Sequence, residues 1–467
     1  MIVRFKNLYS KSPDILKRVV GLIPFGYRMG KAYRETLRFL QQSDKWSMAE
    51  IHSYQQATLG SMLEAAIKNV PYYSKYGHLS GRSPWAILRD IEPISRKEVH
   101  DNLDRFLAQN VDRSRYHATY TGGSSGHPLK IYQDNTVPEV EWAFMIAQWM
   151  RAGYRPGDKR ASFRGVEFKG KADCKVQRNP VYNELLLSPF DLTESALSQY
   201  VYELRKFKPR FLRGYPSAIS ALASFVTDRN IDDLPKVEAV LCGSESFSQG
   251  QRRLIQSAFG ARFYSWYGMT EKVVLAGECE GSALYHCFPQ YGITEVMDSN
   301  GNLSSSPGSS GEIVGTGFLN RAMPLIRYRM EDYSSIVGDR CNKCGRNHLL
   351  LGKVSGHRVQ DYIVGRSGSL ISTTALNMHD NTFESVRQFQ FHQKRKGEVT
   401  LYLRVGDDFD EGKHRLILKS LRSKTASDVD FRIEVVDKID TTGMGKGIYL
   451  RQELLEVKRS TFTPDNE

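Results

Sequence analysis

A stretch rich in glycine and hydroxyl residues, positions 121–130, carries the residue types that suit the binding of an anion. Glycines allow positive φ angles, which let successive backbone N–H groups converge on one phosphate. Hydroxyl groups and a lysine add side-chain donors. The residues concerned are Thr121, Gly122, Gly123, Ser124, Ser125, Gly126 and Lys130. Their order does not fit the P-loop pattern, and a flexible linker has the same composition, so the phosphate-loop interpretation depends on motifs further along the chain.

Two further polar motifs directly follow predicted strands. Residues 237–242 and 262–266 have the apolar character of strands, and residues 248–259 between them have helical periodicity with Gly260 as the expected C-cap. The motifs that follow the two strands are Gly243-Ser244-Glu245 and Tyr267-Gly268-Met269-Thr270-Glu271. In a parallel β-α-β unit both motifs lie at the carboxyl edge of the sheet, where ligands bind. Ordinary turns between strands and helices are the alternative.

The end of the chain predicts a second, smaller α+β domain. Strands are expected at 388–393, 400–405 and 431–436, and an amphipathic helix at 413–424. A glycine-rich loop at 441–447 then exposes Lys446. The boundary between the two domains is expected near residues 356–366, where glycines cluster.

Length and composition favour a soluble, multidomain protein of a reducing compartment. The 467 residues are 40% hydrophobic, enough for two or three domains. No uncharged apolar run is long enough to span a membrane, and the first residues lack a signal-peptide pattern. Six cysteines, two of them in a Cys-x-x-Cys pair, do not suggest a disulfide framework. The expected location is therefore the cytoplasm.

The formal net charge of +13 includes a basic N-terminal segment. Residues 1–45 carry ten Lys or Arg and three acidic residues, a net charge of +7, with apolar residues at near-helical spacing. This pattern is typical of peripheral contact with an anionic membrane, and also of a solvated basic helix, which is the simpler interpretation. A nucleic-acid partner is not expected, because no aromatic-and-basic pattern accompanies the charge.

Taken together, the motifs and their order resemble the adenylate-forming superfamily, which includes acyl-CoA synthetases and non-ribosomal adenylation domains. The similar segments are the phosphate loop 121–128, the Tyr-Gly-x-Thr-Glu motif 267–271, residues 328–332, the hinge segment 357–363 and the C-terminal motif 442–446. Met330 and Glu331 depart from the superfamily's Tyr-Arg-Thr-Gly-Asp motif. Within the superfamily the chain looks most like the phenylacetate–CoA ligase and CapK (capsular polysaccharide) branch. That likeness is carried by residues 69–73, 214–217, 311–317 and 341–346, and it covers residue 50 to the end.

The resemblance implies an α/β fold with a basic segment at 1–45, a large N-terminal domain at 46–358 and a smaller C-terminal α+β lid at 359–467. It also implies a site for ATP and Mg²⁺. Thr121, Ser124, Ser125 and loop amides would hold the β- and γ-phosphates, and Glu271 would bind Mg²⁺ as a hard carboxylate ligand. Asp332 would accept the ribose hydroxyls, Tyr267 would lie near the adenine, and Lys446 would bridge carboxylate and α-phosphate. The full set expected around ATP includes Gly122, Gly123, Gly126, Lys130, Gly243, Ser244, Glu245, Gly268, Thr270 and Arg358.

Cysteine spacing predicts a structural zinc site. Cys279 and His286 follow Glu271, and Cys341 and Cys344 form a close pair, which together give a tetrahedral Cys₃His set. Similar ligands at similar places are a feature of this branch. Cys287 is an alternative ligand to His286. His348 is not expected to bind the metal. The alternative to a metal site is that the cysteines are reduced and bind no ion. Cys174 and Cys242 are expected to be core thiols.

The predicted function is activation of a carboxylic acid as an acyl-adenylate, followed by transfer of the acyl group. The expected acyl acceptor is CoA or another molecule such as an amino sugar of a surface polysaccharide. A dimer is one of the oligomeric states left open. A hinge is expected around Gln360, although the superfamily usually has an acidic residue or lysine there. The alternative function is a catalytically impaired ATP-binding or scaffold protein of polysaccharide assembly, which Met330 and Glu331 keep open.

Overall fold

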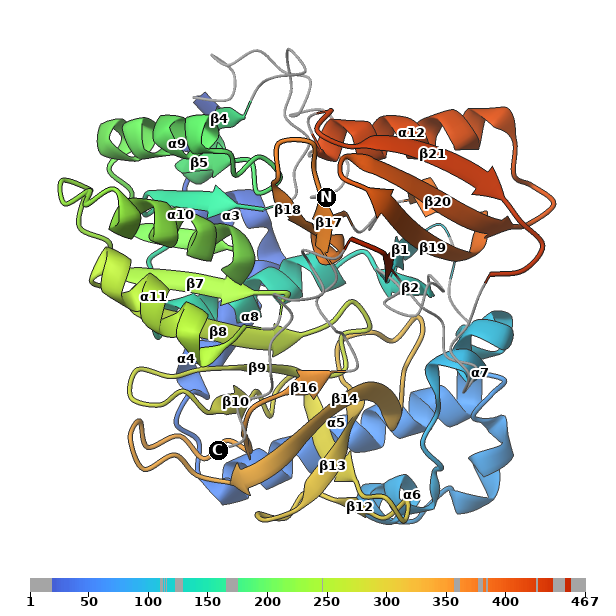
Figure 1. Ribbon diagram of the computed structural model, residues 1–467. Helices are drawn as coiled ribbons and strands as arrows, with labels where there is room; N and C mark the ends of the chain where they lie inside the picture. Colours follow the sequence, from blue (N-terminus) through green and yellow to red (C-terminus); the bar gives the residue numbers. More distant parts are fainter. Residues whose placement is uncertain are drawn as a thin grey trace.

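A large mixed sheet with helices on both faces forms the body of the molecule, and a small four-stranded sheet with its own helix forms the C-terminal part (Figure 1). This is a computed structural model of the chain. It describes residues 19–109, 112, 114, 116–121, 129–164, 175–245, 247–356, 362–376, 381–383, 385–425, 427–439 and 450–454. The architecture is the predicted α/β fold.

Five strands of the large sheet run parallel, in the spatial order β5-β3-β6-β7-β8. Their bounds are β3 (Arg160–Phe163), β5 (Glu184–Leu187), β6 (Phe211–Gly214), β7 (Ala239–Gly243) and β8 (Arg262–Gly268). The crossover helices are α9 (Glu194–Phe207), α10 (Pro216–Asp228) and α11 (Gln249–Phe259). The predicted strand, helix and strand of 237–266 are therefore confirmed, and Gly260 ends α11 in the left-handed region at φ +57°.

Each face of the parallel strands has its own hydrophobic core. Helices α9, α10 and α11 pack on one face through residues such as Leu204, Leu222 and Ile255. On the other face lie α3 (Phe25–Met29), α4 (Lys31–Gln42) and α8 (Val137–Met150), drawn behind the sheet in Figure 1.

An antiparallel region extends the sheet beyond β8. Its strands are β9 (Leu275–Gly277), β10 (Tyr285–Cys287), β11 (Gly292–Met297), β12 (Leu303–Ser304), β13 (Ser310–Gly317), β14 (Tyr328–Gly338), β15 (Leu350–Leu351) and β16 (Ser355–Gly356). Strand β4 (Val176–Asn179) closes the opposite edge. Helices α5 (Met48–Asn69), α6 (Pro84–Asp90) and α7 (Arg96–Asp101) share a core with the antiparallel strands. A separate hairpin of β1 (Tyr116–Tyr120) and β2 (Lys130–Asp134) brackets the predicted phosphate loop.

The helices begin at side chains that cap them. Ser47 and Ser248 form capping boxes with Glu50 and Gln251 at the starts of α5 and α11. Ser95 caps α7 by accepting from the Glu98 amide. These residues satisfy backbone N–H groups that have no partner inside the helix, which fixes where each helix starts.

The C-terminal part has the predicted strands and helix. Its sheet has the order β21-β20-β19-β22, with β19 (Val386–Arg395), β20 (Glu398–Val405), β21 (Asp430–Val435) and β22 (Leu450–Gln452). Helix α12 (Glu411–Lys424) begins at the cap Asp410 and packs Ile417 and Leu421 into the core. A hairpin of β17 (Tyr362–Val364) and β18 (Leu370–Ser372) precedes this sheet.

Among the described residues, no helix is both long enough and apolar enough to cross a membrane.

Candidate nucleotide and metal sites

The two motifs after β7 and β8 lie side by side at the carboxyl edge of the parallel sheet. Gly243 pairs in register with Trp266, so Gly243-Ser244-Glu245 and the motif that begins at Tyr267 leave the sheet as neighbours. A β-carbon at Gly243 would overlap the Trp266 ring, and Ser244 has a φ of +70°. The chain therefore needs glycine at 243 and a left-handed turn at 244.

Contacts from neighbouring strand ends hold this turn. The Glu245 carboxylate accepts from Ser217 Oγ at 2.7 Å and from the Ser217 amide at 3.3 Å. Arg164 Nη1 donates to Ser244 Oγ at 3.3 Å. Residues that follow β3 and β6 thus join the Gly-Ser-Glu turn, so that three adjacent strand ends share one polar edge.

Glu271 is a buried carboxylate at the centre of a second set of contacts. Arg96 Nη1 donates to Glu271 Oε1 at 3.2 Å, and the Tyr328 hydroxyl donates to the same oxygen at 3.0 Å. Arg96 also donates through Nη2 to Thr121 Oγ1. Thr121 Oγ1 in turn accepts from the Leu129 amide at 3.0 Å, across the base of the phosphate loop. Thr121 and Glu271 are therefore held together through one guanidinium.

Local structure places these groups. Ile94 forms a parallel bridge with Tyr328, and its amide donates to the Arg327 carbonyl at 2.9 Å. The chain then turns at the helix cap Ser95, so Arg96, the first residue of α7, faces Glu271. The pKa of Tyr328 is well above its ordinary value, mainly because the side chain is buried and secondly because the Glu271 carboxylate is close. The phenol therefore remains a donor. Arg96 was not predicted, because an arginine in the first turn of a helix carries no distinguishing sequence pattern.

Asp332 of β14 and Tyr267 of β8 contact each other although their strands are not paired. The Tyr267 hydroxyl donates to Asp332 Oδ2 at 2.8 Å. Met330 and Glu331 lie between Tyr328 and Asp332 in the sequence. Met330 is buried in the core. Glu331 has a φ of +57°, and its amide donates to Glu312 Oε1 at 3.0 Å. The two departures from the family motif therefore leave Tyr328 and Asp332 in contact with Glu271 and Tyr267.

The remaining described residues of the predicted ATP set lie nearby. A β-carbon at Gly268 would crowd Leu275, and the Thr270 carbonyl accepts from Gln133 Nε2 of β2 at 3.0 Å. The Lys130 ammonium lies over the rings of Tyr120 and Tyr132, 5.7 and 5.1 Å from their centroids. The Gln133 contact ties the hairpin that carries the predicted phosphate loop to the sheet edge.

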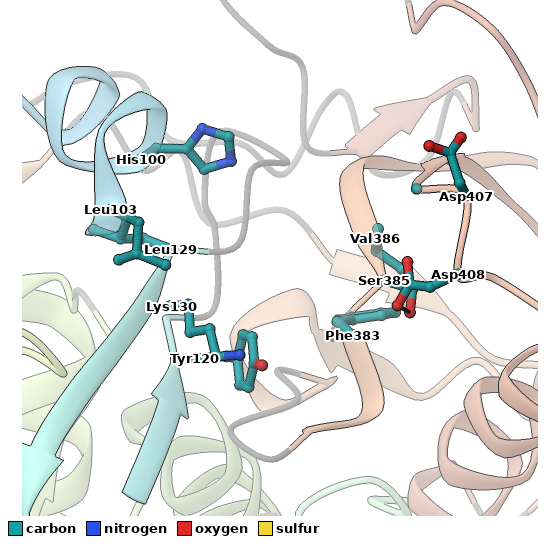
Figure 2. A pocket seen from close by; sticks show the side chains of 11 residues that line it. His100, Leu103, Tyr120, Leu129, Lys130, Phe383, Ser385, Val386, Asp407 and Asp408 are labelled. Atoms are coloured by element: carbon teal, nitrogen blue, oxygen red, sulfur yellow. Dashed lines mark hydrogen bonds between the residues drawn. The ribbon is translucent and has the colours of Figure 1, made fainter. Parts of the chain in front are cut away.

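A cleft of about 450 Å³ separates the hairpin from the C-terminal part (Figure 2). Figure 2 shows His100, Tyr120 and Lys130 on one wall, facing Ser385, Asp407 and Asp408 on the other. Lys413 Nζ donates to Asp408 at 2.7 Å, and that contact together with the Ser385 hydroxyl lowers the Asp408 pKa to about 2. The Asp408 carboxylate on the C-terminal wall is therefore ionised at neutral pH and paired with the Lys413 ammonium.

The four predicted zinc ligands converge. The ligand atoms of Cys279, His286, Cys341 and Cys344 all lie within 4.8 Å of one another. Cys279 Sγ and Cys341 Sγ are 4.0 Å apart, and Cys344 Sγ is 3.4 Å from His286 Nε2. A tetrahedral zinc with Zn–S bonds of 2.3 Å separates two sulfurs by about 3.8 Å, so the set fits that ion. His286 Nδ1 lies 3.0 Å from the Leu284 carbonyl, which leaves Nε2 for the metal.

The alternative ligands are not part of this set. Cys287 follows His286 on β10, so its side chain points to the opposite face, into the core shared with α5. His348 packs against His286 with ring centroids 6.2 Å apart. Cys242 is fully buried in the core, as predicted.

The Cys-x-x-Cys turn also holds the connection between α4 and α5. Arg346 donates to both oxygens of Glu280, at 2.6 and 2.8 Å, and to Asp44 at 2.8 Å. Asn347 Nδ2 donates to the Trp46 carbonyl at 2.8 Å. The turn therefore joins segments 300 residues apart in the chain.

Several predicted site residues lie outside the described residues. They are Gly122, Gly123, Ser124, Ser125 and Gly126 of the phosphate loop, Arg358 and Gln360 of the hinge segment, Lys446 and Cys174. Their roles stay predictions.

Comparisons with known proteins find relatives in sequence and in fold. Residues 363–452 match the CapK C-terminal domain family. Protein CapK of Staphylococcus aureus is 24% identical over 454 residues, which cover 94% of this chain and 97% of the relative. The phenylacetate-coenzyme A ligase of Pseudomonas putida is 24% identical over 415 residues, covering 83% and 90%. The solved structure of 2-hydroxyisobutyryl-CoA ligase in complex with 2-HIB-AMP and CoA has a TM-score of 0.55 at 17% identity, covering 90% of this chain and 93% of that chain.

These relatives confirm the predicted resemblance. The chain is a homologue of CapK and of phenylacetate–CoA ligases, and its fold is that of adenylate-forming CoA ligases. Its class, an adenylate-forming ligase, is the one that the motifs predict.

Proposed function

We propose that this chain uses ATP and Mg²⁺ to convert a carboxylic acid into an acyl-adenylate, and then transfers the acyl group to CoA or another acceptor. The observation that carries the proposal is the contact of Arg96 with both Thr121 and Glu271. A residue at the base of a predicted phosphate loop and a buried carboxylate thereby face the same volume. Such a pairing suits a triphosphate and its cation.

In the first step an oxygen of the acid attacks the α-phosphorus of ATP, and pyrophosphate leaves. Thr121 and the loop amides would hold the departing phosphates, and Glu271 would hold Mg²⁺, which when bound neutralises phosphate charge. Asp332, positioned by Tyr267, would accept the ribose hydroxyls. Lys446 would neutralise charge between the carboxylate and the α-phosphate.

In the second step the acceptor attacks the acyl carbonyl, and AMP leaves. The names of the relatives support CoA as the acceptor, and the CapK name supports a role in surface polysaccharide synthesis, with an amino sugar as the other candidate. The cytoplasm is the proposed location, in keeping with free thiols at all the described cysteines. We propose a structural role for zinc at the Cys₃His set.

An active enzyme is the better supported function than an impaired scaffold. Met330 and Glu331 depart from the family motif, yet Tyr328 still contacts Glu271 and Asp332 still contacts Tyr267. The substitutions thus fall on a core position, where Met330 Sδ lies 3.9 Å from the Tyr267 hydroxyl, and on a turn, and both contacts are kept.

The test is acid-dependent exchange of pyrophosphate into ATP, measured with a pool of carboxylic acids. Wild-type protein should show exchange, and Lys446→Ala should lower its rate by about 10²–10³-fold while ATP affinity stays within a few-fold, since the lysine acts on developing charge. Lys343→Ala, which removes an exposed lysine of the Cys-x-x-Cys turn, is the matched control. Tight ATP binding without exchange for any acid in the pool would support the scaffold alternative instead.

A further inference from the structure

Four large apolar side chains that are close in sequence, near the start of the described chain, are each exposed. The exposed fractions are 57% for Val19, 82% for Leu22, 47% for Ile23 and 68% for Tyr27. We name these four the N-terminal apolar patch. Apart from Tyr333 and Val337, both on β14, the other exposed large apolar residues, such as Tyr202 and Val435, are spread singly along the chain, which is normal for a protein surface. Four exposed large apolar residues within nine positions are unusual for a protein surface.

Buried residues and hydrogen bonds hold the segment that carries the patch in place, so the exposure of the patch side chains is a feature of the folded protein. Phe25 and Met29 of α3 are buried in the core with α8, and the Phe25 ring lies 5.5 Å from that of Tyr33. Arg28 Nε donates to the Ile23 carbonyl at 2.7 Å, and its Nη1 donates to Val181. The buried residues face the sheet while the patch faces solvent (Figure 1 draws α3 behind the sheet).

Basic residues follow the patch in the sequence, and one of them contacts it. Arg34 lies over the Tyr27 ring, 4.8 Å from its centroid. Lys31 and Arg38 are exposed and seven residues apart on α4, so they share one face of that helix, where the exposed Glu35 also lies and pairs with Lys31 at 3.6 Å. Residues 19–45 carry a net charge of +3, and the eighteen residues before them add +4.

We propose that the N-terminal apolar patch docks on an anionic membrane surface. Exposed aliphatic and tyrosine side chains gain by entering the boundary between headgroups and acyl chains, and the Lys and Arg residues close in sequence are attracted to anionic lipids. A second copy of the chain is a poorer occupant, because a twofold contact would bring two basic surfaces together. This inference goes beyond the proposed function and does not depend on it.

The experiment is flotation of the full chain with vesicles. One set contains phosphatidylglycerol mixed with phosphatidylcholine, and the other contains phosphatidylcholine alone, each at low and high salt. Wild-type protein should float with the anionic vesicles, less at high salt. Leu22→Glu and Tyr27→Glu should each lower the bound fraction by about tenfold, and Arg38→Glu should weaken binding at low salt only. Tyr202→Glu and Val435→Glu, which place the same charge on isolated exposed residues, should bind as wild type does.

The outcomes decide the proposal. Loss of binding in the patch variants alone, with unchanged melting temperatures, supports it. Failure of wild-type protein to float with anionic vesicles overturns it, as does equal binding by Leu22→Glu. A wild-type dimer in solution that becomes monomeric in Leu22→Glu, without vesicle binding, would assign the patch to self-association and also overturn it. None of these results depends on adenylation.

Discussion

Arg96 donates to both Thr121 and Glu271, two groups that stand 150 positions apart in the chain. Its side chain is 15% exposed and that of Glu271 is 4% exposed, so this ion pair is shielded from solvent. Removing one partner of a buried pair leaves the other charge uncompensated, which destabilises a protein by about 3–5 kcal/mol. Arg96 therefore has a structural contribution that must be separated from any part in adenylation.

We expect Arg96→Met to lower acid-dependent pyrophosphate exchange by about 100-fold, because the phosphate loop and Glu271 lose their common partner. The melting temperature should also fall. The double variant Arg96→Met with Glu271→Gln should regain stability, since no buried charge is left unpaired, but not exchange. Recovery of both would contradict the roles proposed for Arg96 and for Glu271. Arg82→Met, which removes an exposed arginine paired with Asp90, is the control.

The Asp332 carboxylate should matter for ATP binding. A hydrogen bond to a charged group contributes about 1.5–3 kcal/mol, so Asp332→Asn should raise the KM for ATP about tenfold or more. Tyr267→Phe, which removes the donor at 2.8 Å, should have a smaller effect in the same direction. Asp298→Asn, in an exposed turn, should leave the KM unchanged. An unchanged KM in Asp332→Asn would exclude ribose binding by this residue.

At the scale of elements, the Cys-x-x-Cys turn joins three separate segments of the chain. Its cysteines meet Cys279 and His286 of the antiparallel sheet, and the Arg346 that follows contacts Asp44. Because a structural zinc contributes folding free energy directly, the proposed ion would stabilise both contacts, and its loss should loosen them.

We expect about one zinc per chain, and Cys341→Ser should lose it and lower the melting temperature. Cys287→Ser changes a neighbouring buried cysteine that is outside the ligand set, so it should retain the metal. Elemental analysis of protein purified under reducing, chelator-free conditions gives the zinc content. Metal-free wild-type protein, or equal zinc in the two variants, would contradict the assignment.

The elements that the sequence predicts well are those with strong local patterns. The strands around α11 and those of the C-terminal sheet have regular apolar spacing, and Gly260 marks a helix end that needs a positive φ. The convergence of the Cys₃His set could be predicted because thiols at short spacing are rare, and zinc at this set stays a proposal. By contrast, Arg96 acts through contacts that only the fold creates. The burial of Phe25 in α3 and of Tyr33 in α4 also could not be predicted, because both residues lie in a strongly basic stretch of sequence.

At the scale of the whole molecule, the chain passes from the large sheet to the C-terminal sheet between β16 and β17, and Gln360 lies in that connection. Rotation of the smaller domain between half-reactions would need free backbone dihedrals there. Gln360→Pro fixes φ, so it should leave one half-reaction nearly intact and slow the other strongly. Pyrophosphate exchange reports the first step, and product formation with an accepted acceptor reports the second; Gln360→Ala is the control. Equal loss in both steps with normal folding, or no loss in either, would exclude a hinge at this residue.

The central claim is that an oxygen of the acid bonds to the α-phosphorus of ATP, and it can be followed directly. With a carboxylic acid labelled with ¹⁸O in its carboxyl group, complete turnover should release AMP that carries one labelled oxygen, because the acyl carbon–oxygen bond breaks when the acceptor attacks. Mass analysis of the nucleotide product reads this out. Labelled AMP, formed only when acid and acceptor are both present, is the result the account predicts. Unlabelled AMP, or ADP and phosphate as the products, would contradict it.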